Sequence, residues 1–320
     1  EAVSRTLESG YDDWCVAKMA EKLNDKETYS NFTKRANFYK NLFDTSTQLF
    51  RGKDTNGNWR TPFDPLTATS PMNNPGDYTE ANAWQYSFFV PHQVDAMIKR
   101  YGGDQAFVAR LDQMFDMSSH MEGDVSPDIT GLIGQYAHGN EPSHHIIYLY
   151  AFTDQFKTGQ KYIHQVINDF HQNTPNGMIG NDDCGQMSAW YVLSSMGIYQ
   201  VTPGIEFWTT INPPFFESVQ INLYDNKPKS VNLPYLKSGI FSKLDLRNNK
   251  TNEFENIIPV PVIQAESKAF KDNLKIELKS QNSNDAIYFM INDKDDHLAK
   301  KLFVPYTKPF EISQTSTIEA

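Results

Sequence analysis

The hydrophobic pattern of this chain changes its period once, near residue 205. Before that point apolar residues recur every three or four positions, as Trp14, Ala17 and Ala20 do. After it they alternate with polar residues, as Leu274, Ile276 and Leu278 do. A period near 3.6 indicates helices, and a period of two indicates strands with one buried face. The sequence therefore predicts a mainly α chain with a C-terminal β portion.

The helical part contains serial amphipathic segments joined by loops rich in Gly, Pro, Asn and Asp. Helices are predicted over 12–23, 31–44, 82–103, 107–117, 141–155, 160–173 and 185–199, and strands over 217–226, 272–280 and 285–293. Helix pairs in series predict a helical toroid and not a βαβ sheet. We expect a helical region over 1–205, a strand-rich extension over 206–263 and a small β module over 264–320.

Composition narrows the classes of partner. The formal net charge is −10, which argues against nucleic acid, because a partner of that kind normally requires a basic surface. The sequence has no stretch close to the ~20 apolar residues of a membrane span, and it shows no obligate protein partner. Aromatic residues make up 13%, which suits sugar binding, although most rings belong to the core. Cys15 and Cys184 are predicted to be buried thiols, with one disulfide as the alternative.

Glu80 is the candidate in the first of three polar clusters that fall on loops. It lies in the sequence GDYTEANAWQY (76–86), just before an aromatic helix. It could be a first-turn carboxylate in a helix that Asp77 or Thr79 caps. Alternatively, nearby aromatic rings would desolvate the carboxyl, raise its pKa and make it a general acid.

The second cluster is GQYAHGNEPSHH (134–145), which combines histidines with oxygen ligands. Asn140 and Glu141 precede Pro142, as at the start of a helix. Zinc is conceivable, but His144 and His145 are adjacent and would face different sides of a helix. Amide and carboxylate oxygens favour a hard cation such as Ca²⁺.

The third cluster is GNDDCG (180–185), at the start of an apolar helix. A cap formed by Asn181 or Asp183 would explain one polar residue. The pair Asp182 and Asp183, together with Asn181, supplies more oxygen atoms than a cap needs. A metal would relieve the repulsion between these carboxylates, and one of them could act as a general base.

One acid, one base and an oxygen-ligated cation together outline an inverting glycosidase. Such enzymes hold two carboxyl groups ~6.5–9.5 Å apart, so that a water molecule fits behind the anomeric carbon. The sequence contains no phosphate-binding loop, dinucleotide fingerprint or Ser–His–Asp order that would indicate another chemistry.

Four segments resemble glycoside hydrolase family 92, the calcium-dependent exo-acting α-mannosidases. They are SRTLESGYDDWCVAKMA, YTEANAWQYSFFVPHQVDAMI, HGNEPSHHIIYLYAF and GNDDCGQMSAWYVLSSMGIYQVTPG, in the family's order over roughly residues 3–205. The resemblance implies an (α/α)6 barrel, which in the family follows an N-terminal β-sandwich. This chain looks like most of the barrel without that sandwich.

The resemblance also implies roles for single residues. Glu80 would be the general acid, and Asp183, with Asp182 as the alternative, would be the base that acts through water. Ca²⁺ ligation would fall on Asn140, Glu141 and Asp183. The residues implied to contact the substrate are Gln135, His138, Trp84 and Asn181.

The expected substrate is a mannose-containing glycan, with terminal α-mannose removed from N-glycan-type mannosides. An extracytoplasmic location follows from that substrate and from calcium. The tail resembles the small C-terminal β domain of chitobiase-type enzymes, with spacing as its expected role. Two alternatives remain open: a catalytically impaired carbohydrate-binding protein of this fold, and a metal-independent trehalase-like toroid glycosidase.

Overall fold

The computed structural model divides into two compact units, Glu1–Leu246 and Arg247–Ala320. The structure describes residues 2–70, 76–153, 155–204, 208–210, 215–216, 219–222, 228–231, 239–241, 261–267, 269–280, 286–293 and 303–319. Most of the predicted extension over 206–263 lies outside the described residues, so the predicted division into three parts stays a prediction.

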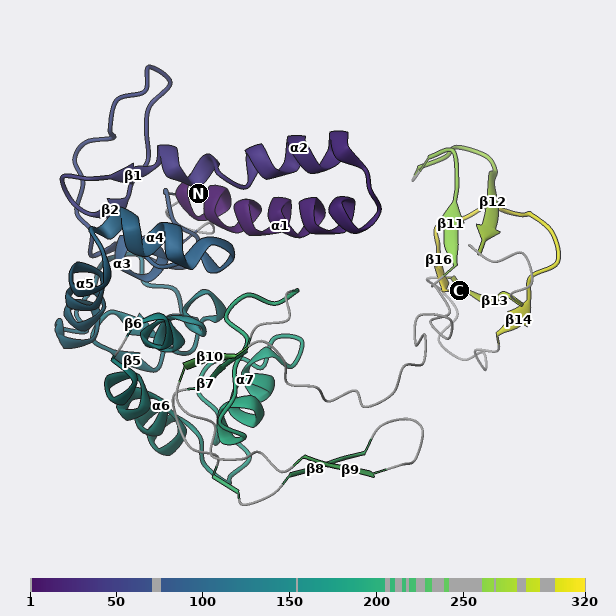
Figure 1. The fold of residues 1–320 in the computed structure, drawn as a ribbon. Helices are drawn as coiled ribbons and strands as arrows, with labels where there is room; N and C mark the ends of the chain where they lie inside the picture. The colour runs from purple at the N-terminus through teal and green to yellow at the C-terminus, as the bar shows by residue number, and fades with distance from the viewer. Residues whose placement is uncertain are drawn as a thin grey trace. The chain divides into compact units, whose positions relative to one another are not determined.

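Unit 1 is mainly helical, as its periodicity predicts. Its helices are α1 (Ala2–Lys22), α2 (Lys26–Arg35), α3 (Ala83–Tyr86), α4 (Val94–Tyr101), α5 (Asp104–Asp116), α6 (Phe156–Phe170) and α7 (Gln186–Ser195), with 3₁₀ helices η1 (Phe38–Asn41), η2 (Pro91–Gln93), η3 (Glu141–Ser143) and η4 (Ile146–Phe152). The predicted helix over 141–155 is thus two 3₁₀ segments. Helices α1 and α2 lie side by side as a hairpin (Figure 1). The (α/α)6 toroid stays a prediction.

Short strand pairs tie the loops of unit 1 together. They are β1 (Phe43–Asp44) with β2 (Leu49–Phe50), β3 (Thr67–Ala68) with β4 (Glu122–Gly123), β5 (Leu132–Ile133) with β6 (Tyr136–Ala137), β7 (Trp208–Thr210) with β10 (Gly239–Phe241), and β8 (Val219–Asn222) with β9 (Pro228–Val231). Only the β3–β4 pair is parallel. Strands of two residues leave no period in a sequence, which is why most of them are not predicted.

A large aromatic core supports these loops. Trp190 on α7 is fully buried, and its Nε1–H donates to the carbonyl oxygen of His144 at 3.1 Å. The rings of Tyr148 and Tyr199 stack at 4.4 Å between centroids. Burial of rings of this size is a dominant stabilising contribution, and each buried polar atom of such a ring needs a partner. The core therefore fixes α7 and η4, which flank the loops that carry the polar clusters.

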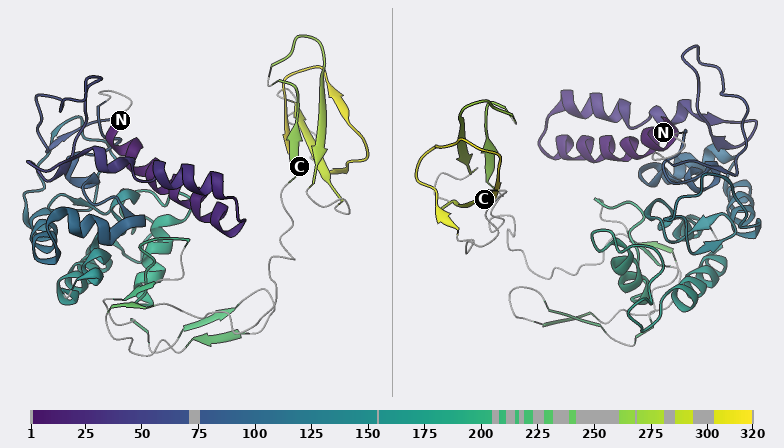
Figure 2. Two further views of the ribbon diagram at one scale, coloured as in Figure 1. Left: turned by 45° about the horizontal axis from the view of Figure 1, so that its top comes forward. Right: turned by 180° about the vertical axis from the view of Figure 1, so that it is seen from behind.

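The described residues of unit 2 form two antiparallel three-stranded sheets. The sheets are drawn in green to yellow in Figure 2. Their strands are β11 (Val262–Gln264), β12 (Leu274–Lys279), β15 (Phe310–Ile312), β14 (Val304–Pro305), β13 (Tyr288–Asp293) and β16 (Ser316–Glu319). The predicted alternation in β12 is confirmed, because Leu274, Ile276 and Leu278 are buried between exposed or half-buried neighbours. Side chains of both sheets contribute to one hydrophobic cluster.

The prediction for the cysteines is wrong in one respect. Both thiols are free, but Cys15 and Cys184 are exposed and not buried. Cys15 lies on the outer face of α1, whereas Val3, Leu7 and Ala17 of that helix are buried. Cys184 lies in a turn with a φ of 57°. Of the described helices, none is both long and apolar enough to cross a membrane.

Candidate active site

Glu80 lies outside the helix that follows it. Helix α3 begins at Ala83, and Asn82 caps it by accepting from the backbone N–H groups of Trp84 and Gln85. The capping role proposed for Asp77 or Thr79 therefore belongs to Asn82. Glu80 itself has a φ of 49°, in the left-handed region that residues with a side chain rarely adopt. Strain of this kind is common at functional sites.

The surroundings of Glu80 favour its protonated form. Burial raises the pKa of Glu80, and the negative charges of Asp128 and Asp183 raise it further. Desolvation and like charges both disfavour a carboxylate. Glu80 therefore has the properties of a proton donor.

The loop with Asn140 and Glu141 contacts the Glu80 segment. The Asn140 side chain does not cap η3 but donates from Nδ2 to the carbonyl oxygen of Glu80 at 3.2 Å. Pro142 occupies the first turn of η3, as its sequence position indicates. Two regions 60 residues apart in sequence are thus joined at the backbone of the candidate acid.

The GNDDCG loop divides its two carboxylates between different roles. Asp182 Oδ1 accepts from the backbone N–H of Ser188 at 2.8 Å and so caps the start of α7. Asp183 is exposed, with a φ of 35°. The cap predicted for Asn181 or Asp183 is therefore made by Asp182. Asp183 is the carboxylate of this loop that remains available for chemistry.

Three of the predicted residues line one cavity of about 590 Å³. The cavity is bounded by Glu8, Tyr11, Asp12, Thr79, Glu80, Tyr86, Phe89, Pro91, Asn140, Glu141, Pro142, His145, Gln186, Tyr199, Gln200, Val201 and Pro203. Asp183 lies close to it, because its carboxylate contacts Glu141 and raises the pKa of that group, after burial as the main cause. Aromatic rings and carboxylates in one concave site are suited to a hydroxyl-rich ligand such as a sugar.

Trp84 and Gln135 are buried and do not line this cavity. Gln135 is fully buried; its Oε1 accepts from Asn82 at 2.8 Å and its Nε2 donates to the carbonyl oxygen of Ser118 at 2.7 Å. The guanidinium of Arg110 stacks on the Trp84 ring at 3.9 Å. Gln135 supports the segment after Glu80 through its hydrogen bond with Asn82, and Trp84 is packed in the core. Their predicted contact with substrate therefore has no support in this geometry.

His138 is also a core residue. It is fully buried, and its Nδ1 shares a 2.8 Å hydrogen bond with the hydroxyl of Tyr136. Burial, followed by the neighbouring His144 and His171, lowers the pKa of His138 well below its usual value. His138 is not among the residues that line the cavity, so its predicted contact with a sugar has no support in this geometry. Asn181 is exposed and donates to Asp128 at 3.1 Å.

The oxygen donors near the cavity fit a hard cation. Glu141 Oε1 is buried without a hydrogen-bond partner, and the Glu141 carboxylate contacts that of Asp183. A divalent ion would bind Glu141 Oε1 and would offset the repulsion between the carboxylates of Glu141 and Asp183. In the described part of the chain, no three His, Cys, Asp or Glu side chains form a metal-binding group. A site here would therefore also need neutral oxygens, and Asn140 offers one.

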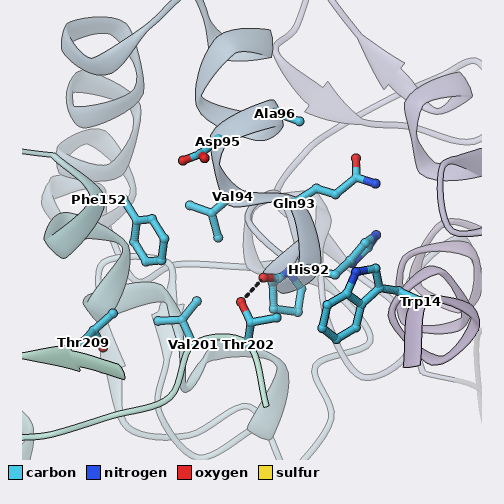
Figure 3. A pocket seen from close by; sticks show the side chains of 11 residues that line it. Trp14, His92, Gln93, Val94, Asp95, Ala96, Phe152, Val201, Thr202 and Thr209 are labelled. Atoms are coloured by element: carbon cyan, nitrogen blue, oxygen red, sulfur yellow. Dashed lines mark hydrogen bonds between the residues drawn. The ribbon is translucent and has the colours of Figure 1, made fainter. Parts of the chain in front are cut away.

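A second cavity, of about 510 Å³, lies against η2 and the first turn of α4 (Figure 3). Val94, Phe152 and Val201 face its interior, with Trp14 and His92 on another side. Thr202 donates to the carbonyl oxygen of Pro91 at its edge. Among the described residues that line it, Asp95 is the one carboxylate, whereas Glu8, Asp12, Glu80 and Glu141 line the first cavity.

Sequence reasoning missed several carboxylates at the site, including Asp12 in the lining of the cavity. Asp128 lies between β4 and β5, and Glu8 on α1 accepts a 2.6 Å hydrogen bond from Tyr86. Both charges raise the pKa of Glu80, after burial. Glu8 lies within a helical pattern that explains it without function. Asp128 follows Pro127 in an irregular loop, and acidic residues in such loops are the signal that could have identified it.

Most of this chain is similar in sequence to known proteins. A model of the glycosyl hydrolase family 92 catalytic domain matches residues 1–256. A protein of Arthroderma benhamiae described as an uncharacterized secreted glycosidase is 31% identical over 238 residues, which are 69% of this chain and 28% of that protein.

Solved structures show the same relationship. A family GH92 α-mannosidase from Bacteroides thetaiotaomicron, in complex with mannoimidazole, is 38% identical and has a TM-score of 0.65, over 72% of this chain and 30% of that one. An inverting mannosidase of the same family and organism is 31% identical and has a TM-score of 0.59, over 72% of this chain and 31% of that one. This chain thus matches less than a third of the length of these relatives.

The family match covers the described helices and the loops that bear Glu80, Asn140, Glu141 and Asp183. The similar structures share the arrangement of that region. The resemblance drawn from the four sequence segments is confirmed, and the chain belongs to glycosyl hydrolase family 92 through its catalytic domain.

Proposed function

We propose that this chain carries catalytic residues of an exo-acting α-mannosidase. It would hydrolyse terminal α-mannose from N-glycan-type mannosides, with inversion and with Ca²⁺. The observation that carries the proposal is that Glu80 and Glu141 line one cavity and that Asp183 lies beside it, in contact with Glu141. Support also comes from the relatives named α-mannosidase and inverting mannosidase.

Glu80 is the proposed general acid. As the bond between the anomeric carbon and the glycosidic oxygen breaks, its electron pair goes to that oxygen, which takes the proton of Glu80. The raised pKa of Glu80 favours its protonated form, which is the form that donates. The contact of Asn140 with the Glu80 backbone holds the donor at the cavity.

Asp183 is the proposed general base, with Asp182 as the alternative. The base accepts a proton from a water molecule as the water oxygen bonds to the anomeric carbon from the opposite face, which inverts the configuration. Asp183 is favoured because Asp182 already accepts a hydrogen bond from the start of α7, which fixes the direction of its side chain.

Asn140, Glu141 and Asp183 are the proposed ligands of Ca²⁺. A Ca²⁺ ion held there would bind sugar hydroxyls and offset the negative charge that gathers at the cavity. The residues of this chain contribute the oxygens, and Glu141 Oε1 is buried and unpaired as a ligand oxygen would be.

A neutral glycan suits the charge of the cavity, whose lining includes Glu8, Asp12, Glu80 and Glu141. Carboxylates accept hydrogen bonds from hydroxyl groups, and rings such as Tyr11 and Phe89 can stack on sugar C–H faces. An extracytoplasmic location is proposed from this substrate and from the relative described as secreted.

Calcium removal tests the proposal. We expect the full-length protein to release mannose from an α-mannobioside, to lose that activity in EDTA and to regain it with Ca²⁺. ¹H NMR of the early product should show β-mannose first, because the attack inverts the anomeric carbon. Retained activity in EDTA would favour a metal-independent, trehalase-like mechanism. Binding of the sugar without turnover would favour a carbohydrate-binding protein.

A further inference from the structure

The local conformation around Asp128 is fixed by short-range hydrogen bonds. Its Oδ2 accepts from the Ser126 hydroxyl at 2.9 Å, and its backbone N–H donates to the same hydroxyl at 3.4 Å. The backbone N–H of Ile129 donates to the carbonyl oxygen of Ser126 at 3.0 Å. Local bonds of this type set the direction of an Asp side chain. The other oxygen of Asp128 therefore points in a defined direction.

That oxygen holds the GNDDCG loop. Asp128 Oδ1 accepts from Asn181 Nδ2 at 3.1 Å, across 53 residues of sequence. A hydrogen bond to an ionised carboxylate is roughly twice as strong as one between neutral groups. Asn181, which sequence reasoning assigned to the substrate, thus has a partner on a neighbouring loop.

The GNDDCG loop contains strained residues, so its conformation depends on contacts with other segments. Asp183 and Cys184 have φ values of 35° and 57°, so both lie in the left-handed region, where a residue with a side chain is strained. Asp183 is exposed, so packing does not fix its side chain, and its direction depends on the backbone. On the other side, Gly180 packs so tightly that a Cβ there would lie 2.6 Å from the carbonyl oxygen of Gly139.

Asp128 also lies near the reacting groups. Its charge is the first of the charges that raise the pKa of Glu80, and it contributes to the raised pKa of Glu141. The loop of Asp128 is joined to the Asn140 loop, because the backbone N–H of Gly139 donates to the carbonyl oxygen of Thr130 at 3.0 Å. Three loops therefore meet at the Asp128–Asn181 bond.

We propose that Asp128 is a positioning residue. Its hydrogen bond with Asn181 fixes the strained backbone that orients Asp183 toward the substrate. This inference rests on the proposed function, because it assumes that Asp183 acts in mannoside hydrolysis. Asp128 itself touches neither the substrate nor the attacking water. Its effect is on the geometry of the base, and a displacement of about 1 Å can cost on the order of 100-fold in rate.

A reciprocal swap tests the proposal. Asn181→Asp places two carboxylates together, and we expect kcat on an α-mannobioside to fall on the order of 100-fold, with KM changed less than about threefold. Adding Asp128→Asn restores one amide and one carboxylate with the donor reversed. The double variant should recover kcat by at least about tenfold. A purely structural effect would not be relieved by a second substitution.

Alanine variants and a matched control complete the test. Asp128→Ala and Asn181→Ala should each lower kcat, and together no more than the larger single effect. Asp124→Asn, in the same loop but without the Asn181 contact, should stay near wild type. Three outcomes would overturn the role of Asp128. The effects of the two alanine substitutions on kcat could multiply, or the swapped double variant could fold without recovering kcat. Asp124→Asn could also lower kcat as much as the Asp128 variant does. A wild type inactive on all α-mannosides would instead refute the proposed function, and the inference with it.

Discussion

The helical unit and the strand unit bury their side chains in different ways. Unit 1 builds an aromatic core that includes Trp190, Tyr148 and Phe88, and its loops carry the left-handed residues. Within the described chain, every residue with a positive φ lies at or before Gly204. Unit 2 has regular strands and a smaller cluster, in which buried aliphatic residues around Ile276 pack against partly buried rings such as Phe289 and Phe310. Strained loops persist where a large core holds their ends, which is why we place function in unit 1.

The largest expected effect of a single substitution is at Glu80. Glu80→Gln should lower hydrolysis of an α-mannobioside by roughly 10²–10⁴-fold, because the amide has no proton to donate to the leaving oxygen. A mannosyl substrate whose leaving group needs no proton should be much less affected. Steady-state rates on both substrates measure this, with exposed Glu21→Gln on α1 as the control. Equal loss on both substrates would exclude Glu80 as the acid.

Core substitutions in the two units test whether the units unfold independently. Trp190→Ala should destabilise unit 1 by about 3–5 kcal/mol, and Ile276→Ala should destabilise unit 2 by about 2–5 kcal/mol, because each leaves a cavity. All tryptophans, at positions 14, 59, 84, 190 and 208, belong to unit 1. Tryptophan fluorescence in a urea titration should therefore shift with the first substitution and not with the second. A shift with Ile276→Ala would show that the units unfold together.

Acid should destabilise unit 1 selectively. Burial lowers the pKa of His92, His144 and His145 to about 4. The unfolded chain binds protons at these positions below pH ~6.5, whereas the native chain does not until about pH 4, so stability is complete above ~6.5 and falls as the pH drops between the two. Each group contributes at most about 3 kcal/mol to this loss.

The measurement is urea unfolding at pH 7, 5.5 and 4.5, followed by tryptophan fluorescence. The buried histidines that give this dependence, His92, His144 and His145, all lie in unit 1, and the one histidine of unit 2, His297, lies outside the described residues. His145→Gln should weaken the dependence, since Gln does not titrate. A midpoint that stays constant between pH 7 and 4.5 would contradict the assignment.

The smallest expected effect is that of removing most of unit 2, from residue 257 onward. A chain that ends at residue 256, where the family match ends, should keep mannose release within about a factor of two of the longer chain. The reason is that the carboxylates of the cavity and its aromatic lining all belong to unit 1. A large loss of activity in a folded truncated chain would show that the C-terminal unit takes part in the site and is more than a spacer.

The sequence by itself determined the helical and β portions, the three polar loops and the family. Local periodicity and short motifs carry these, because each depends on neighbouring residues. It also selected Glu80 and Asp183 as candidates, because a carboxylate in a polar loop beside an aromatic or apolar helix suggests chemistry; their roles stay predictions.

Tertiary structure decided which of the polar residues act together. The sequence predicts that Gln135 and His138 contact the substrate, but both side chains are buried in the core. Asp182 caps α7, whereas Asp183 is available for chemistry. Asp128 joined the site only through a hydrogen bond that spans 53 residues. Burial and such pairings depend on how distant segments pack, and a local sequence pattern holds no record of that packing.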